Sequence, residues 1–138
     1  MIVLDTNVLS EPSKSVVNPV VMEWLERQQI DGLYTTSVNA MELLEGIGRL
    51  PEGARKRSLE SANGKVLNEL EGRILPFDVA AAEAYADLMN STRRNGLSVR
   101  VADCMIAAVA SIHGFVVATG DDAPFKAMGL KVINPWTA

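Results

Sequence analysis

The chain is poor in the residues that build disulfide frameworks, histidine-based active sites and membrane anchors. Its 138 residues contain one cysteine, Cys104, and one histidine, His113. A single cysteine excludes an intrachain disulfide framework, which agrees with a reducing compartment, and a single histidine excludes metal-free catalysis by a histidine pair. No secretory leader or long apolar span is visible, because the opening apolar run is interrupted at Asp5. We therefore expect a soluble, cytoplasmic protein that does not enter a membrane.

An excess of positive charge is also missing. The chain has 13 lysines and arginines against 17 acids, and its formal net charge is −4. Non-specific attraction of nucleic acid by bulk charge is therefore not predicted. Two local basic runs remain, and we interpret them mainly as solvent-facing helix surfaces: Arg49, Arg55, Lys56 and Arg57, and then Arg93, Arg94 and Arg100.

Short apolar runs alternate with amphipathic segments along the chain. Strand-like runs lie at residues 2–4, 33–36, 73–77, 115–119 and 131–133. Helix-like segments lie at residues 6–10, 19–29, 38–49, 51–70 with an interruption near Asn63-Gly64, 78–95, 99–113 and 123–128. Ser37 is the expected cap of the helix at 38–49. Strands separated by helices favour a parallel sheet with right-handed crossovers. We predict an α/β fold in which residues 1–138 form one domain, with a parallel central sheet of about five strands flanked by helices.

The first informative stretch is the beginning of the chain, where a buried strand is followed directly by Asp5. Ligands of open α/β sheets bind beyond the carboxyl ends of the strands, so Asp5 is a candidate site residue. Its alternative role is to cap the next helix or to begin a turn. The pattern recurs after residues 115–119, where Asp121 follows the strand and Asp122 is the alternative acid. If these two strands are neighbours, Asp5 and Asp121 emerge side by side.

Two helices carry further acids near their beginnings. Glu42 lies about one turn into the helix at 38–49, where it can stabilise the helix end, and Glu45 is the competing acid nearly on the same face. Asp103 lies in the helix at 99–113, which is apolar almost all round. A buried charge costs several kcal/mol unless it is paired or neutralised. Asp103 therefore needs a partner, and Arg100, the helix dipole and a metal ion are the three candidates.

The remaining chemistry-bearing residues of that helix have structural interpretations. We expect Cys104 to behave as a small buried hydrophobic residue and His113 to interact with the dipole at the helix end.

Four acids from distant parts of the chain can meet at one edge of the predicted sheet. Two carboxylates about 4 Å apart repel each other by roughly 4 kcal/mol at an effective dielectric constant near 20, so a cluster of them requires a cation. Oxygen ligands without histidine or cysteine favour Mg²⁺, with Mn²⁺ as the other choice. The four residues are Asp5, Glu42, Asp103 and Asp121.

The same motifs carry a family resemblance that covers essentially the whole sequence. They are residues 2–10, residues 37–46 with Met-Glu-Leu inside, Ala102-Asp103 followed by Ile106-Ala107-Ala108, residues 118–121, and the terminal Asn134-Pro135-Trp136. In this order and spacing they resemble PIN-domain ribonucleases, and in particular the VapC toxins of bacterial toxin–antitoxin pairs of the FitB-like group. Three positions differ from the usual pattern: Gly120 replaces an arginine that is often found there, Pro124 replaces a further aspartate, and Glu45 takes a position that is often basic or apolar.

The resemblance implies a site, a reaction and partners. It makes Asp5, Glu42, Asp103 and Asp121 the catalytic acids that bind the divalent metal. Thr6 and Asn7 would support the first acid, Thr119 would support the fourth, and Arg100 is a candidate for contacting the substrate. The implied reaction is endonucleolytic hydrolysis of RNA by metal-activated water. The implied partners are an RNA substrate, a cognate antitoxin that occludes the acidic pocket, and a second copy in a homodimer or a larger toxin–antitoxin assembly.

Several alternatives remain open at this point. The domain is alternatively a catalytically weak module that acts through protein partners. A phosphoacceptor signalling domain also gathers acids on a parallel sheet, but Asp5 is followed by Thr6 instead of a second acid, and only Lys126 and Lys131 lie late in the chain. Residues 20–25 and residues 51–70 are both candidates for the dimer interface and for the antitoxin interface, and the sequence does not distinguish between them. It does not specify the RNA target either.

Overall fold

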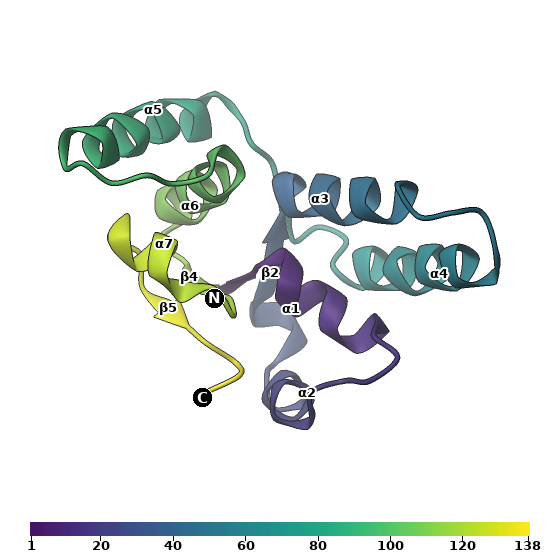
Figure 1. The fold of residues 1–138 in the computed structure, drawn as a ribbon. Helices are drawn as coiled ribbons and strands as arrows, with labels where there is room; N and C mark the ends of the chain where they lie inside the picture. The colour runs from purple at the N-terminus through teal and green to yellow at the C-terminus, as the bar shows by residue number, and fades with distance from the viewer.

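A parallel sheet of five strands runs through the middle of the molecule (Figure 1). The computed structural model describes residues 1–138. The strands are β1 (Ile2–Leu4), β2 (Leu33–Thr36), β3 (Ile74–Leu75), β4 (Val116–Ala118) and β5 (Val132–Ile133), in the order β3-β2-β1-β4-β5. All four strand pairs are parallel, which confirms the predicted sheet and the adjacency of the first and fourth strands.

Seven α-helices connect the strands. They are α1 (Thr6–Ser10), α2 (Pro19–Glu26), α3 (Ser37–Gly48), α4 (Ala54–Glu69), α5 (Val79–Arg94), α6 (Val101–His113) and α7 (Asp122–Ala127). Two short 3₁₀ turns, η1 (Glu11–Ser13) and η2 (Ile30–Gly32), flank α2. None of the helices is long and apolar enough to span a lipid bilayer.

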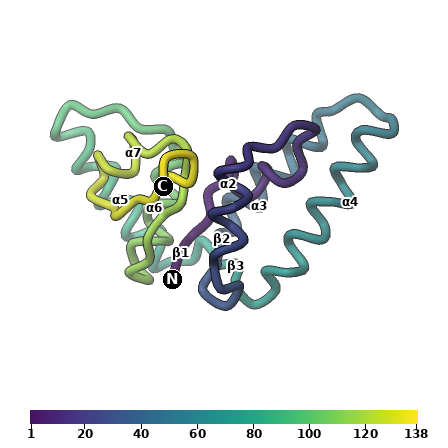
Figure 2. The backbone as a smooth tube through the Cα atoms, turned by 90° about the horizontal axis from the view of Figure 1, so that it is seen from below, coloured from purple at the N-terminus to yellow at the C-terminus, as the bar shows by residue number.

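The helices form two groups, one on each side of the sheet. Helices α5, α6 and α7 lie on one side, and α2, α3 and α4 lie on the other (Figure 2). Helix α6 packs against α5 and contributes Cys104, Ile106, Ala107 and Ala110 to the larger apolar core. The smaller core joins Leu4, Val8 and Leu9 to Leu33 and Leu70 on the opposite side. The prediction that the helix at 99–113 is central, with Cys104 as a buried apolar residue, is therefore confirmed.

The strand order reverses direction at β1. From β1 the chain moves outward through β2 to β3, and it then returns to the other side of β1 with β4 and β5. In doubly wound sheets such a reversal leaves a crevice at the carboxyl edge, which is where ligands bind. Here the crevice lies between the ends of β1 and β4, whose register pairs Leu4 with Ala118.

Several predicted boundaries are wrong for identifiable reasons. Helix α4 is continuous through Asn63 and Gly64, because Asn63 is 3 % exposed and is held against the rest of the fold. Helix α2 ends at Glu26, three residues earlier than expected. The hydroxyl of Ser37 accepts a hydrogen bond from the Phe77 backbone N–H, so Thr36 caps α3 in its place through the Asn39 N–H.

Candidate active site

Four acids from four different parts of the chain line one pocket at the carboxyl edge of the sheet. Asp5 follows β1, Glu42 lies on α3, Asp103 lies on α6, and Asp121 follows β4. The pocket has a volume of about 280 Å³ and no hydrophobic residue in its lining. Its other lining residues are Thr6, Asn7, Ser10 and Arg100. We refer to it below as the acidic pocket.

Asp5 is the most firmly held of the four acids. It is 6 % exposed, and its Oδ1 accepts hydrogen bonds from the Thr6 backbone N–H at 2.8 Å and from Asn39 Nδ2 at 3.0 Å. Its Oδ2 accepts a bond from the Thr119 hydroxyl at 2.7 Å. Burial raises the pKa of Asp5, and these hydrogen bonds oppose the rise. Asp5 also caps α1 through Thr6, so the capping role and a position in the pocket are compatible.

The three polar residues predicted to support the acids all lie beside them. The Thr6 hydroxyl donates to Glu42 Oε1 at 2.8 Å. Asn7 donates to Thr119 Oγ1 at 3.2 Å and accepts from the Gly120 backbone N–H at 3.2 Å. Thr119 Oγ1 also accepts from the Asp121 N–H at 3.1 Å. The ends of β1 and β4 are thus joined by side chains as well as by the sheet.

Glu42 faces the acidic pocket, whereas Glu45 lies outside it. The Glu42 side chain is 23 % exposed, and its Oε2 lies 3.4 Å from the Arg100 guanidinium. Glu45 forms a surface ion pair with Arg49 at 3.1 Å. Arg100 therefore pairs with an acid 58 positions away in the sequence, and the local ion pair between Arg100 and Asp103 is not formed.

Asp103 is buried without an ion-pair partner. It is 7 % exposed, and burial raises the pKa of its carboxyl group. Arg100 acts in the opposite direction, while the charges of the three other acids raise the pKa further. Of the partners considered from the sequence, an ion pair with Arg100 is absent, and Arg100 moderates the charge only from a distance.

Asp121, and not Asp122, reaches the acidic pocket. Asp121 is exposed at its rim and makes no capping bond to α7 with its side chain. Asp122 pairs with Lys126 on the outer side of α7. His113 is exposed at the far end of α6, where its ring lies against Phe115 with a centroid separation of 5.4 Å, and it has no place in the pocket.

The donor chemistry of the acidic pocket suits a hard divalent cation. Carboxylate oxygens line it without histidine or cysteine. The pKa of Asp103 is raised first by burial and further by the charges of the other three acids, and a bound cation would offset both effects. No three of the acidic side chains are close enough together in this arrangement to hold one ion. The Glu42 carboxylate is directed to the Thr6 hydroxyl and to the Arg100 guanidinium.

Asn39 is a site residue that the sequence interpretation missed. It is fully buried on α3, and its amide nitrogen donates to both Asp5 Oδ1 and Thr6 Oγ1 at 3.0 Å. Its oxygen accepts from the Thr36 hydroxyl at 2.6 Å. A signal was present, because Asn39 lies three residues before Glu42 and therefore on the same helix face.

Gly120 is required by the packing of the C-terminal segment. A Cβ atom at this position would lie 2.9 Å from the ring of Trp136. Asn134 Nδ2 donates to the Gly120 carbonyl oxygen at 3.4 Å, which fastens the same segment. An arginine at this position would require the Trp136 ring to shift.

Comparisons with known proteins identify the family. A sequence model described as the PIN domain matches residues 2–130. VapC ribonuclease Y4jK of Sinorhizobium fredii is 45 % identical over 99 % of this chain and 98 % of its own length. Toxin FitB of Neisseria gonorrhoeae is 38 % identical over 99 % of both chains. The crystal structure of FitAcB from the same species matches with a TM-score of 0.95 at 37 % identity, and covers both chains completely. The chain belongs to the PIN domain family.

Proposed function

We propose that this protein is a divalent-metal-dependent endoribonuclease and the toxin of a toxin–antitoxin pair. The observation that carries the proposal is the convergence of Asp5, Glu42, Asp103 and Asp121 in one polar pocket at the switch point of the sheet. The relatives named as a VapC ribonuclease and as a toxin support the same activity and the same biological role. RNA is the substrate in this proposal, which places the protein in the cytoplasm.

The four acids are the proposed metal ligands and catalytic residues. A bound Mg²⁺, or Mn²⁺ in its place, supplies a more acidic water and positive charge at the phosphate. Three hydrogen bonds fix the Asp5 carboxylate, and the Thr6 hydroxyl orients Glu42. Thr119 and Asn7 fix the loop that carries Asp121. Arg100 is exposed beside the pocket and can contact a phosphate oxygen of the RNA.

The decisive experiment is cleavage of a mixed RNA pool by the purified protein. We expect cleavage with Mg²⁺ or Mn²⁺, none with EDTA, and none from Asp5→Asn in the presence of metal. Glu45→Gln is the matched control, because Glu45 is an exposed acid on the same helix as Glu42 and lies outside the pocket. Cleavage that persists in EDTA or in Asp5→Asn contradicts the enzyme proposal, and an intact pool with all preparations favours the module that acts only through protein partners.

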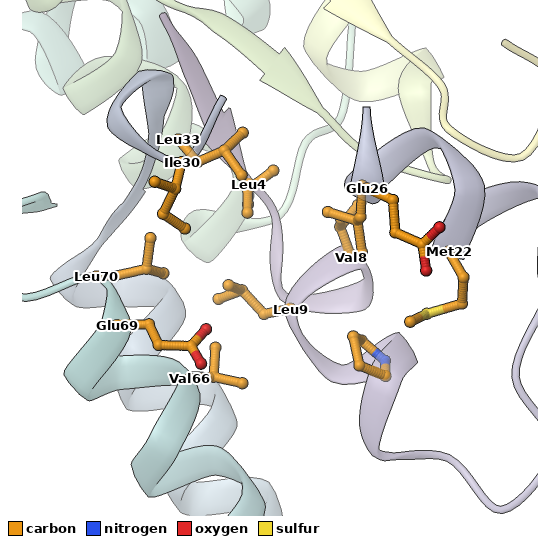
Figure 3. Close-up of a pocket in the computed structure, with 12 residues that line it drawn as sticks. Leu4, Val8, Leu9, Met22, Glu26, Ile30, Leu33, Val66, Glu69 and Leu70 are labelled. Atoms are coloured by element: carbon orange, nitrogen blue, oxygen red, sulfur yellow. The ribbon is translucent and has the colours of Figure 1, made fainter. Parts of the chain in front are cut away.

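Helix α1 separates the acidic pocket from an apolar groove, and this groove is the proposed docking surface for the antitoxin. Figure 3 shows Leu4, Val8 and Leu9 at its floor, with Met22 and Val66 on its two walls. The groove joins the two segments that the sequence offered as alternative interfaces, since α2 forms one wall and α4 the other. Glu26 and Glu69 lie at its edges. This pattern favours a partner segment that carries apolar side chains flanked by basic ones.

A homodimer completes the proposed assembly. Helix α3 exposes two large apolar side chains three residues apart, Met41 at 54 % and Leu44 at 58 %. Exposed apolar residues that share one helix face favour association with another surface. Light scattering on the protein and on Leu44→Glu tests this assignment, and a monomer at all concentrations contradicts it.

A further inference from the structure

Two cavities adjoin the acidic pocket, one on each side. The first has a volume of about 330 Å³ and lies between α1, α3 and α4, which are gathered on one side of the sheet (Figure 1). The second has a volume of about 400 Å³ and lies between α6 and α7. We call them the α4 arm and the α7 arm.

Each arm shares part of its wall with the acidic pocket. The residues common to the pocket and the α4 arm are Thr6, Ser10 and Glu42. The residues common to the pocket and the α7 arm are Arg100, Asp103 and Asp121. The three cavities are therefore neighbours along the carboxyl edge of the sheet, and the acidic pocket lies between the two arms.

The α4 arm is lined by two cations that no catalytic role uses. Arg55 lies in the first turn of α4, is exposed, and forms no ion pair. Its basic neighbours are engaged elsewhere or lie outside the arm. Lys56 pairs with Glu52 at 2.7 Å, and Arg57 is exposed but does not line the arm.

The second cation, Lys14, is anchored at the mouth of the α4 arm. Its ammonium group lies 2.6 Å from Glu11 Oε2, and the lysine side chain is 54 % exposed. Glu11 is 2 % exposed, and its Oε1 accepts from the Asn18 backbone N–H at 2.8 Å. An ammonium group has three donors, so Lys14 can contact a further anion while it remains paired with Glu11.

The arms differ in chemistry, and the difference indicates where a polyanion binds. The acidic pocket repels phosphate, and the net charge of −4 gives no general attraction, so a nucleic acid strand needs cations close to the site. Both arms include apolar lining residues, and their charges distinguish them. In the α7 arm one cation, Arg100, stands against two acids, Asp103 and Asp121. In the α4 arm two cations, Lys14 and Arg55, stand against Glu42, and Ser10 and Ser13 add hydroxyls.

We propose that the α4 arm is the phosphate-binding arm of the substrate cleft, in which Lys14 and Arg55 hold the backbone of the single RNA strand next to the bond that is cleaved. This inference rests on the ribonuclease function proposed above and adds the path of the strand. Lys14 and Arg55 are substrate-binding residues here and take no part in binding the metal.

Binding of a fluorescent single-stranded RNA of random sequence tests the arm. The measurements use Arg55→Ala, Lys14→Gln and the double variant, each combined with Asp103→Asn so that the RNA stays intact. We expect each substitution to weaken binding about tenfold. The slope of log Kd against log salt should fall by about 0.7 for each lost phosphate contact. Arg57→Ala, two residues from Arg55 on the same exposed helix, should bind like the parent protein.

Separate readouts distinguish the arm from the catalytic site. With Asp103 intact, the double variant should keep the wild-type kcat on saturating RNA and the wild-type Mn²⁺ affinity, while its KM rises.

The conservative variant Arg55→Lys should recover most of the RNA binding. If Lys14→Gln disturbs Glu11, the result for Arg55→Ala alone is decisive. If RNA affinity and salt slope match those of Arg57→Ala while the wild type cleaves RNA, the arm is not the strand path. If the wild type cleaves no RNA, the proposed function itself has failed.

Discussion

Asp103 is a buried acid of the pocket that forms no ion pair. It is 7 % exposed and has no ion pair, and three other acids raise its pKa in addition to the effect of burial. We predict that Asp103→Asn abolishes RNA cleavage and, in EDTA, raises the free energy of unfolding by about 1 kcal/mol, because it removes like-charge repulsion.

Urea unfolding in EDTA measures this effect, with Glu45→Gln as the control that should change neither stability nor cleavage. A loss of stability for Asp103→Asn in EDTA would mean that the carboxylate is a structural partner within the fold. The electrostatic argument for a bound cation would then lose its basis.

Arg100 is expected to compete with the metal for Glu42. Its guanidinium lies 3.4 Å from Glu42 Oε2 and is largely exposed, so the pair is worth up to about 1 kcal/mol. We predict that Arg100→Gln tightens Mn²⁺ binding up to about fivefold, because the ion no longer has to displace the guanidinium. Titration of Mn²⁺ followed by electron paramagnetic resonance measures the affinity, and Arg94→Gln on α5 serves as a control. Unchanged Mn²⁺ affinity in Arg100→Gln would show that the ion pair is not displaced.

Glu11 should give the stability a defined dependence on pH. The hydrogen bond from Lys14 lowers the pKa of Glu11 from its ordinary value of 4.5, burial opposes this, and the Asn18 N–H assists it. A lowered pKa in the folded state means that the contribution is present above pH 4.5 and is lost as the pH falls through the folded value. Glu11→Gln should therefore cost about 1–2 kcal/mol at pH 7 and progressively less below pH 4.

Chemical unfolding of both proteins across this pH range gives the comparison. Glu52→Gln removes an acid that is 88 % exposed and should show no such trend. A difference between wild type and Glu11→Gln that stays constant with pH would contradict the assignment.

At the residue scale, the acids of the pocket could be predicted from the sequence, but their hydrogen-bond and ion-pair partners could not. Asp5 and Asp121 were predictable, because each follows an apolar run and the ends of neighbouring parallel strands meet. Asn39 was missed. Its spacing from Glu42 places it on the same helix face, but a buried amide in a helix does not indicate which chain segment it will bond. The partner of Arg100 was also hidden, because local spacing favoured Asp103, whereas the fold brings Glu42 closer.

At the scale of elements, Gly120 joins the end of β4 to the C-terminal segment. A Cβ atom there would lie 2.9 Å from two atoms of the Trp136 ring, so we predict that Gly120→Ala destabilises the protein by about 1–3 kcal/mol. In a Trp136→Leu background the same change should cost much less. A double-mutant cycle measured by urea unfolding quantifies the coupling, and additive effects would show that the contact is not responsible.

The elements themselves were mostly predictable from periodicity, and their ends were not. The interruption expected at Asn63-Gly64 does not occur, because tertiary packing of Asn63 outweighs the weak helix preference of the pair. The cap of α3 moves from Ser37 to Thr36 because a distant backbone group, the Phe77 N–H, uses the Ser37 hydroxyl. Which hydroxyl caps a helix therefore depends on contacts between distant segments, and a local sequence pattern does not show them.

At the scale of the whole molecule, the apolar groove and the acidic pocket should be separable. Val66 lines the groove from α4 and is only partly buried, and the groove shares no lining residue with the acidic pocket. We predict that Val66→Asp weakens binding of the cognate antitoxin at least tenfold and leaves RNA cleavage unchanged, because it places a charge among apolar contacts.

Calorimetric titration with the antitoxin and a cleavage assay on the same preparation test this separation. Lys65→Asp, the exposed neighbour of Val66 on α4, is the control for added negative charge on that helix. Wild-type antitoxin affinity in Val66→Asp would remove the groove from consideration as the docking surface.

The strand order also governs when the acids can meet during synthesis. Asp5 directly follows β1 and Asp121 closely follows β4, so Ile2 must pair with Val116 before the two acids can share the pocket. A nascent chain that is still incomplete therefore lacks a working centre, however well its first helices have formed. Removal of the residues after Phe115 should therefore abolish the acidic pocket, even though Asp5, Glu42 and Asp103 all remain in the shortened chain.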